Sequence, residues 1–182
     1  AYGVSACLVG SGMGIRDRSR IGPGVRLRLD ANGAWGVPEA LRHLDRLAEF
    51  DIEFLEEPVA GIENLAAVRN SSPVPIAVDE SAPTVEDISR AVETGAADLV
   101  VLKPSAIGGP SEAARAAAIV RDAGMNVVVT SLLEGSVGIR AAAHLASAIG
   151  AVDPAPGLAT ASLLAVDVAT PFLPVNGELL LG

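Results

Sequence analysis

The chain has 182 residues, of which 50% are hydrophobic and only 3% aromatic, so disorder is excluded and the core must consist mainly of aliphatic side chains. The net charge of −9 argues against partners that are nucleic acids or anionic membranes, because their phosphates repel an acidic protein. No uncharged run reaches the roughly 18 apolar residues of a membrane span, and a single cysteine, Cys7, excludes an internal disulfide and favours the reducing cytoplasm.

Short β-rich runs alternate with helical stretches along the chain. The later runs are continuously apolar, as expected of parallel strands that are buried on both faces. The predicted strands are residues 25–30, 52–57, 75–79, 99–103 and 127–131, with a weaker sixth at 157–160. The predicted helices are residues 38–50, a helix that begins at a Thr84–Asp87 capping box and ends at Gly95, residues 110–123 and residues 137–149.

The predicted strands end at a regular spacing, at Asp30, Glu56, Asp79, Lys103 and Ser131. Successive ends are 23–28 residues apart, which is the length of one strand, one helix and two short loops. The expected fold class is therefore α/β with a parallel sheet, either open or closed into a barrel. Because a full (β/α)₈ barrel needs about 250 residues, about six βα units would make a partial one. Residues 1–20 show no period and are expected to be irregular.

Charged residues occupy four consecutive strand ends. Asp30, Glu56 and Asp79 each end a strand, and in parallel α/β folds these ends build the functional site. Three oxygen ligands from adjacent strands suit Mg²⁺. The alternative is that the three carboxylates are ordinary loop and cap residues, as we expect for Glu57 and Glu80.

Lys103 is the one lysine among 13 basic residues. It ends an apolar strand in a chain that otherwise uses arginine for its cations. A lysine can lose its proton when buried, whereas an arginine cannot, so Lys103 is the candidate catalytic cation. The alternative is a side chain that extends from the strand end into solvent.

Four ordered motifs resemble the muconate-lactonizing branch of the enolase superfamily. They are residues 30–35 (DANGAW), 55–58 (LEEP), 78–81 (VDES) and 102–105 (LKPS). Residues 130–138 (TSLLEGSVG), 157–160 (GLAT) and 171–174 (PFLP) most resemble the o-succinylbenzoate synthase family of the actinobacterial type. The resemblance runs from about residue 21 to residue 182.

The resemblance implies a modified (β/α)₈ barrel beneath an N-terminal capping domain. By motif position it makes Asp30, Glu56 and Asp79 the magnesium ligands and Lys103 a catalytic lysine. It places Asn32 and the loop residues Ser131, Glu134, Gly135 and Ser136 near a small-molecule carboxylate substrate. The implied reaction is a dehydration through an ene-diolate, a hydro-lyase step in menaquinone synthesis.

The resemblance also implies an organisation in three parts. These are a segment at residues 1–20 that does not match the family, a partial barrel at residues 21–165 and a C-terminal tail at residues 166–182. We expect the chain to be part of a longer protein, with the capping domain, the first two strands and their lysine motif outside it. Three other functions remain open, namely an N-acylamino acid racemase or dipeptide epimerase, a cycloisomerase and a non-catalytic fragment. The oligomeric state is not predicted.

Overall fold

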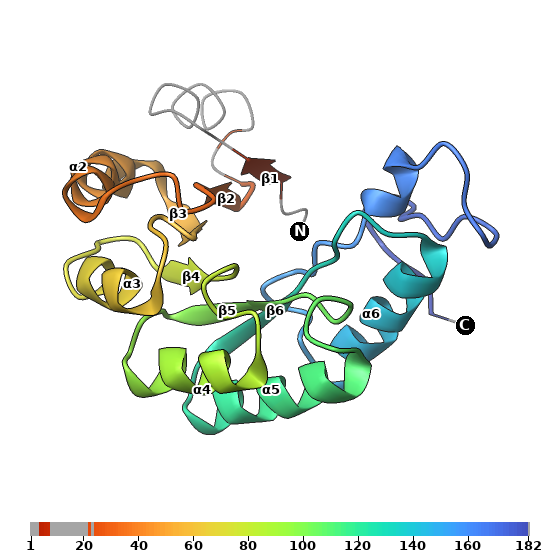
Figure 1. The fold of residues 1–182 in the computed structure, drawn as a ribbon. Coiled ribbons are helices and arrows are strands. Elements are labelled where there is room, and N and C mark those ends of the chain that lie inside the picture. Colours follow the sequence, from red (N-terminus) through yellow and green to blue (C-terminus); the bar gives the residue numbers. More distant parts are fainter. Residues whose placement is uncertain (1–3, 8–21, 23, 182) are drawn as a thin grey trace. The chain divides into compact units, whose positions relative to one another are not determined.

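The computed structural model describes residues 4–7, 22 and 24–181, which divide into two compact units, Ala1–Val100 and Val101–Gly182. The first unit contains strands β1 (Val4–Cys7), β2 (Leu27–Asp30), β3 (Ile52–Glu56) and β4 (Ile76–Val78) with helices α2 (Val37–Leu47), η1 (Ala48–Phe50), α3 (Ile62–Arg69) and α4 (Val85–Glu93). Strand β5 (Leu99–Leu102) crosses the division, and the second unit continues with α5 (Pro110–Asp122), β6 (Asn126–Val129), α6 (Ser136–Ala148) and η2 (Thr160–Leu163). Figure 1 shows this alternation of strands and helices, which confirms the α/β class.

The strands follow one another in the sheet in chain order, from β1 to β6. The pairs from β1 through β5 are parallel, as the predicted crossover helices require. The β4 and β5 residues are nearly inaccessible to solvent. These two strands therefore show the continuous apolar pattern from which they were predicted.

The helices bury one stripe each, as amphipathic helices do. In α2 the buried residues are Ala40, Leu44 and Leu47. At the start of α4 the predicted cap is confirmed, because the Thr84 hydroxyl accepts the Asp87 N–H at 3.1 Å. Helix α3 was not predicted: it has eight residues and a weak apolar periodicity, too little for recognition from sequence.

Two expectations about strands need correction. Within residues 1–20, which were expected to be irregular, Val4–Cys7 form β1 and pair with β2; residues 8–20 lie outside the described part. Four residues are too few to show a period, and only the pairing with β2 makes them a strand. The weak sixth strand shortens to a single parallel bridge between Thr130 and Gly157. Pro154 and Pro156 before it have no N–H to donate, and η2 begins three residues after the bridge.

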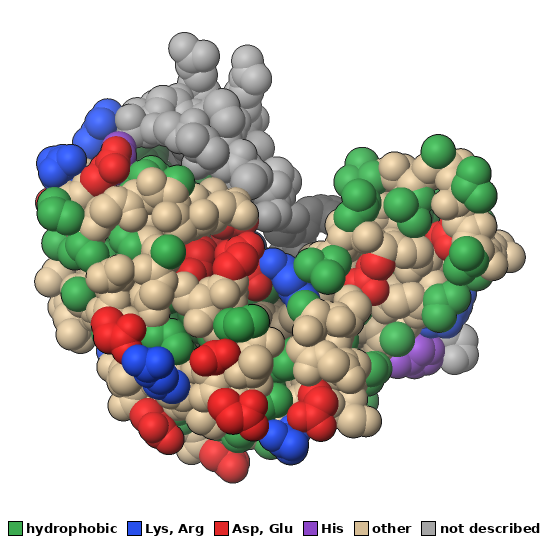
Figure 2. Space-filling model, in the orientation of Figure 1, with side chains coloured by type: hydrophobic (Ala, Val, Ile, Leu, Met, Phe, Trp, Pro, Cys, Tyr) green, Lys and Arg blue, Asp and Glu red, His purple; other side chains and the backbone are tan. Residues whose placement is uncertain are grey.

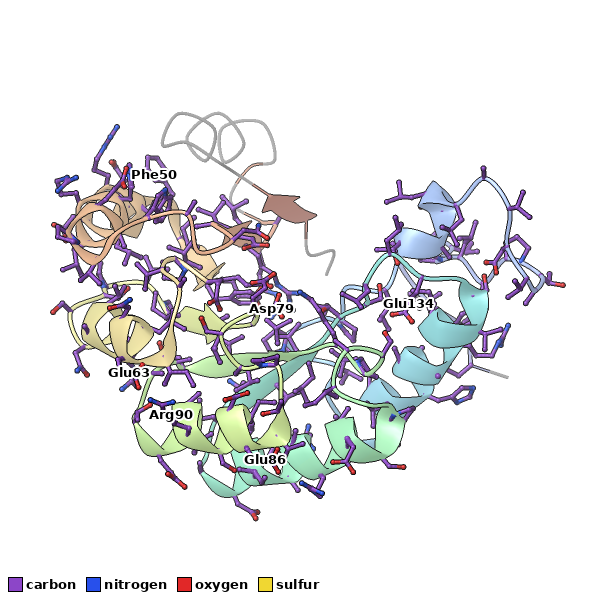
Figure 3. All side chains as sticks on the ribbon, in the orientation of Figure 1. Phe50, Glu63, Asp79, Glu86, Arg90 and Glu134 are labelled. Atoms are coloured by element: carbon purple, nitrogen blue, oxygen red, sulfur yellow. The ribbon has the colours of Figure 1, made fainter. Side chains whose placement is uncertain are left out.

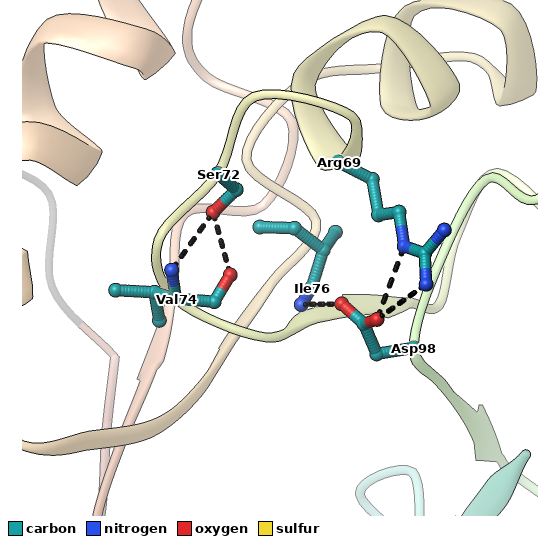
Figure 4. A network of polar contacts seen from close by, with 5 residues as sticks. All are labelled: Arg69, Ser72, Val74, Ile76 and Asp98. Atoms are coloured by element: carbon teal, nitrogen blue, oxygen red, sulfur yellow. Dashed lines mark hydrogen bonds and ion pairs between the residues drawn. The ribbon is translucent and has the colours of Figure 1, made fainter.

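A polar network ties α3 to the start of β4 and β5, at the edge of the sheet opposite the charged strand ends (Figure 4). Asp98 accepts hydrogen bonds from the Arg69 guanidinium at 2.9 and 3.0 Å and from the Ile76 N–H at 2.8 Å. The hydroxyl of Ser72 bonds to the backbone of Val74 in the turn between them. The network satisfies backbone groups where the chain enters β4.

The longest helices of the described part, α5 and α6, have 13 residues each, and none of its helices could cross a membrane.

The segment after α6 is mostly irregular, and Figure 2 shows hydrophobic side chains on its surface. The most exposed of them are Leu163, Val166, Val168 and Leu180. The proposed boundaries at residues 21, 165 and 166 stay predictions.

Candidate metal centre and substrate loop

The carboxylates expected to bind metal lie on neighbouring strands of the first unit. Asp30 and Glu56 are direct register partners at the ends of β2 and β3, and Glu56 is in turn the partner of Ala77 in β4. Asp79 stands two residues after Ala77, the position that strand alternation places on the same face. Figure 3 shows Asp79 at the end of β4. The register thus places Asp30 and Glu56 on one face at the carboxyl ends of the strands, and continued alternation beyond β4 predicts the same face for Asp79.

The donor set fits a hard divalent cation, because three carboxylates offer only oxygen ligands. Across residues 4–7, 22 and 24–181, however, no three His, Cys, Asp or Glu side chains already form a group that could hold a metal ion. The register of Asp30, Glu56 and Asp79 supports the predicted site, and the convergence of their oxygens stays a prediction.

Asn32 lies two residues after Asp30 in a tight turn. Its backbone N–H donates to Asp30 Oδ1 at 2.8 Å, and its φ of 48° is in the left-handed region that Asn tolerates better than most residues. The turn leaves Asn32 exposed beside the candidate metal ligand. This position is compatible with the expected contact to substrate.

Glu57 was expected to be an ordinary loop residue, and the structure shows otherwise. It is 2% exposed, and its carboxylate accepts hydrogen bonds from the Asp79 N–H at 2.8 Å and from the Ser81 hydroxyl. Burial raises the pKa of the Glu57 carboxyl above its ordinary value, and the hydrogen bonds from Ser81 and Asp79 oppose that rise. No local pattern distinguishes Glu57 from Glu56, so sequence reasoning missed it.

Lys103 follows β5 directly and belongs to the second unit. Its carbonyl accepts the N–H groups of Ala106 and Ile107 at 2.9 and 3.2 Å, so a tight turn fixes the backbone at this residue. The side chain is half-buried. Its role in catalysis stays a prediction.

Ser131, Glu134 and Gly135 lie in the loop between β6 and α6, and Ser136 is the first residue of α6; the contact of these residues with substrate stays a prediction. The Ser131 hydroxyl lies 3.0 Å from the Thr160 hydroxyl. Glu134 Oε1 accepts the Ser105 hydroxyl at 2.9 Å and the Leu132 N–H at 3.2 Å, so the carboxylate links this loop to the turn after β5. Figure 3 shows Glu134 ahead of α6.

Ser136 differs from the three loop residues. It is 2% exposed, its hydroxyl donates to Asp167 at 2.7 Å, and the same oxygen accepts the Phe172 N–H at 2.7 Å. These bonds attach the C-terminal segment to the start of α6. They argue for a structural role of Ser136 rather than the expected contact with substrate.

Residues 17–181 match the model of the enolase C-terminal domain-like family, and the chain belongs to this family. It is 45% identical over 163 residues to the o-succinylbenzoate synthase of Thermobifida fusca (strain YX), a match that covers 89% of this chain and 50% of the relative. The o-succinylbenzoate synthase of Mycobacterium tuberculosis (strain ATCC 25618 / H37Rv) is 43% identical over 154 residues, covering 84% of this chain and 46% of the relative. The chain thus spans about half the length of the curated relatives it matches.

Solved structures of the same superfamily have the same fold. The dipeptide epimerase of Enterococcus faecalis V583 matches with a TM-score of 0.88 and 28% identity over 94% of this chain and 52% of the epimerase. The muconate lactonizing enzyme of Pseudomonas putida also has a TM-score of 0.88, with 26% identity over 97% of this chain and 51% of the enzyme. These matches confirm the predicted partial (β/α)₈ barrel and the resemblance to this branch of the superfamily.

Proposed function

We propose that the protein to which these residues belong is an o-succinylbenzoate synthase, a lyase that dehydrates a small-molecule carboxylate. The observation that carries the proposal is the 45% identity to a curated synthase over 89% of the chain. The motif residues Asp30, Glu56, Asp79 and Lys103 all stand at strand ends, which supports a catalytic rather than a structural reason for the similarity.

Asp30, Glu56 and Asp79 would hold Mg²⁺. The supporting observations are the register pairing of Asp30 with Glu56, the position of Asp79 just after β4, and an all-oxygen donor set. A solved relative, the E. faecalis dipeptide epimerase, is described in complex with Mg and the dipeptide L-Leu-L-Tyr, and it matches this chain with a TM-score of 0.84. When bound, the ion supplies positive charge against the negative charge that builds up as a substrate carboxylate loses its α-proton.

Lys103 is the proposed catalytic residue of this chain. Its ammonium group would stabilise developing negative charge on the substrate, a role that suits a compact cation. Asn32, Ser131, Glu134 and Gly135 are the proposed substrate contacts. A side chain at Gly135 would lie only 2.8 Å from Asp167 Oδ1, so glycine keeps this loop in its observed path.

A second candidate function is epimerization of a dipeptide or an N-acylamino acid. Dipeptide epimerases are among the solved structures that match this chain, and their reaction also begins with removal of a proton next to a carboxyl group. The higher identity to curated synthases favours dehydration. Cycloisomerization and a non-catalytic role are weaker alternatives, and a cytoplasmic location stays a prediction.

The decisive experiment follows product formation by the complete protein that carries this chain, with Mg²⁺ and with a chelator. We expect Mg²⁺-dependent formation of o-succinylbenzoate, detected by the ultraviolet absorbance of its new aromatic ring. Dipeptides and N-acylamino acids are tested in parallel for loss of chirality at the α-carbon. Epimerization without dehydration would replace the first function by the second, and the absence of both reactions would favour a non-catalytic role.

A further inference from the structure

Glu57 connects the three loops that follow β2, β3 and β4. Its carbonyl accepts the N–H of Gly33 in the β2 loop at 2.6 Å. Its side chain accepts the N–H of Asp79 and the hydroxyl of Ser81 in the β4 loop. One residue of the β3 loop therefore contacts both neighbouring loops, and these three loops adjoin the proposed magnesium ligands.

All the hydrogen bonds around the Glu57 side chain run toward its carboxylate, which only accepts. The Gly61 N–H donates to Ser81 Oγ at 2.7 Å, and the Ser81 hydroxyl donates to Glu57 Oε1. The Asp79 N–H donates to Glu57 Oε2 at 2.8 Å. Both carboxylate oxygens of Glu57 act as acceptors, so an amide or an alkyl group could not replace the carboxylate without leaving a donor unmatched.

The burial and the backbone conformation of Glu57 both cost free energy, so the surrounding structure must hold this residue in place. A carboxylate that is 2% exposed costs free energy unless hydrogen bonds compensate for the lost water. Glu57 also has a φ of 42°, in the left-handed region that a side chain with a Cβ rarely adopts. Such a conformation persists only where the surroundings enforce it, and it often marks a functional site.

We propose that Glu57 is a positioning residue, which sets the backbone of Asp79 and the neighbouring loops so that the three strand-end carboxylates can share one cation. The inference rests on the proposed function, in which Asp79 is a ligand. Glu57 does not contact the ion or the substrate in this proposal. It acts through the Asp79 backbone, as groups that hydrogen-bond metal ligands do in other metal sites.

The test measures Mn²⁺ as a probe of the magnesium site, by electron paramagnetic resonance titration of the complete protein well below its unfolding temperature. Glu57→Ala should weaken Mn²⁺ binding by up to about 100-fold and Glu57→Gln by about tenfold, the range typical of outer partners of metal ligands. The glutamine keeps the size of the side chain but offers only one acceptor oxygen. The matched controls are Glu49→Ala and Glu49→Gln at an exposed glutamate, which should bind Mn²⁺ like the wild type.

The outcomes separate this inference from the proposed reaction. Weaker Mn²⁺ binding in both Glu57 variants supports the positioning role even if the wild type forms no o-succinylbenzoate. If Glu57→Gln binds Mn²⁺ with wild-type affinity, the inference is overturned even if dehydration occurs. A Glu57 variant that unfolds at a lower temperature but keeps its Mn²⁺ affinity overturns it as well. If Glu57→Ala does not fold, Glu57→Gln decides alone, and a wild-type protein that binds no Mn²⁺ also overturns the inference.

Discussion

Asp30 and Glu56 lie side by side as register partners at the carboxyl ends of β2 and β3. Two carboxylates placed side by side repel each other unless a cation or a donor compensates their charge. The register therefore places two of the three predicted ligands next to each other in the first unit, and the cation between them stays a prediction.

Removal of either carboxylate should therefore reduce metal affinity. We expect Asp30→Asn and Glu56→Gln each to weaken Mn²⁺ binding beyond the roughly 10- to 100-fold loss typical of groups that only support the ligands. Calorimetric titration measures the affinity. Asp45→Asn, at an exposed position of α2, is the charge-matched control. Unchanged affinity in both variants would place the metal elsewhere.

Lys103→Arg tests the proposed catalytic lysine. The substitution keeps the positive charge but enlarges the head group and prevents proton loss. We expect kcat for o-succinylbenzoate formation to fall by about 10²- to 10³-fold, the usual effect of removing one group that stabilises the transition state. Circular dichroism should show a retained fold. Arg121→Lys, exposed in α5, should leave turnover unchanged, and near-normal turnover in Lys103→Arg would contradict the assignment.

Gly138 and Glu134 should be energetically coupled. A Cβ at Gly138 would collide with the Glu134 carboxylate, which the Ser105 hydroxyl and the Leu132 N–H hold in place. Gly138→Ala alone should therefore forfeit these hydrogen bonds. In a Glu134→Ala background it should instead stabilise α6 by about 0.5–1 kcal/mol, the usual gain of alanine over glycine in a helix. A urea-unfolding double-mutant cycle measures the coupling, and additive effects would refute the predicted clash.

The Asp98 network should contribute to stability without a role in catalysis. Asp98→Ala removes the acceptor of the Ile76 N–H and of the Arg69 guanidinium. We expect the free energy of unfolding to fall by about 1–3 kcal/mol, the cost of leaving a buried donor unpaired. Urea unfolding measures it, with Asp122→Ala at the exposed end of α5 as the control. A loss no larger than in the control would show that water replaces the carboxylate.

Acid should weaken the attachment of the C-terminal segment. The hydroxyl and N–H of Ser136 donate to Asp167 and hold the pKa of that carboxyl below its ordinary value of 3.8. A group with a lowered folded pKa stabilises the fold above its unfolded pKa and loses that effect as the pH falls through the folded value. The unfolding-temperature difference between wild type and Asp167→Asn should be constant well above pH 3.8 and shrink as the pH falls through that value. A difference that does not change with pH would mean that the charge of Asp167 is unimportant.

Local patterns in the sequence were sufficient for the α/β class and for most elements. Strands β2 to β6 fall within or one residue from their predicted runs. Strands β4 and β5 were recognisable because a parallel strand buried on both faces is apolar throughout. The Thr84 cap was predictable because a capping box acts between residues three positions apart. Strand β1 and helix α3 were not, because a short element with weak periodicity depends on the partner against which it packs.

The candidate site divides in the same way. The sequence by itself identified Asp30, Glu56, Asp79 and Lys103 as strand-end residues. The apolar runs before them recur at a regular spacing, and charged side chains end each run. Only the tertiary structure decided that Asp30 and Glu56 are register partners, that Ser136 is buried beneath the C-terminal segment, and that Glu57 is buried with both carboxylate oxygens accepting hydrogen bonds. Register, burial and hydrogen-bond partners join residues that are distant along the chain, and local sequence patterns do not contain that information.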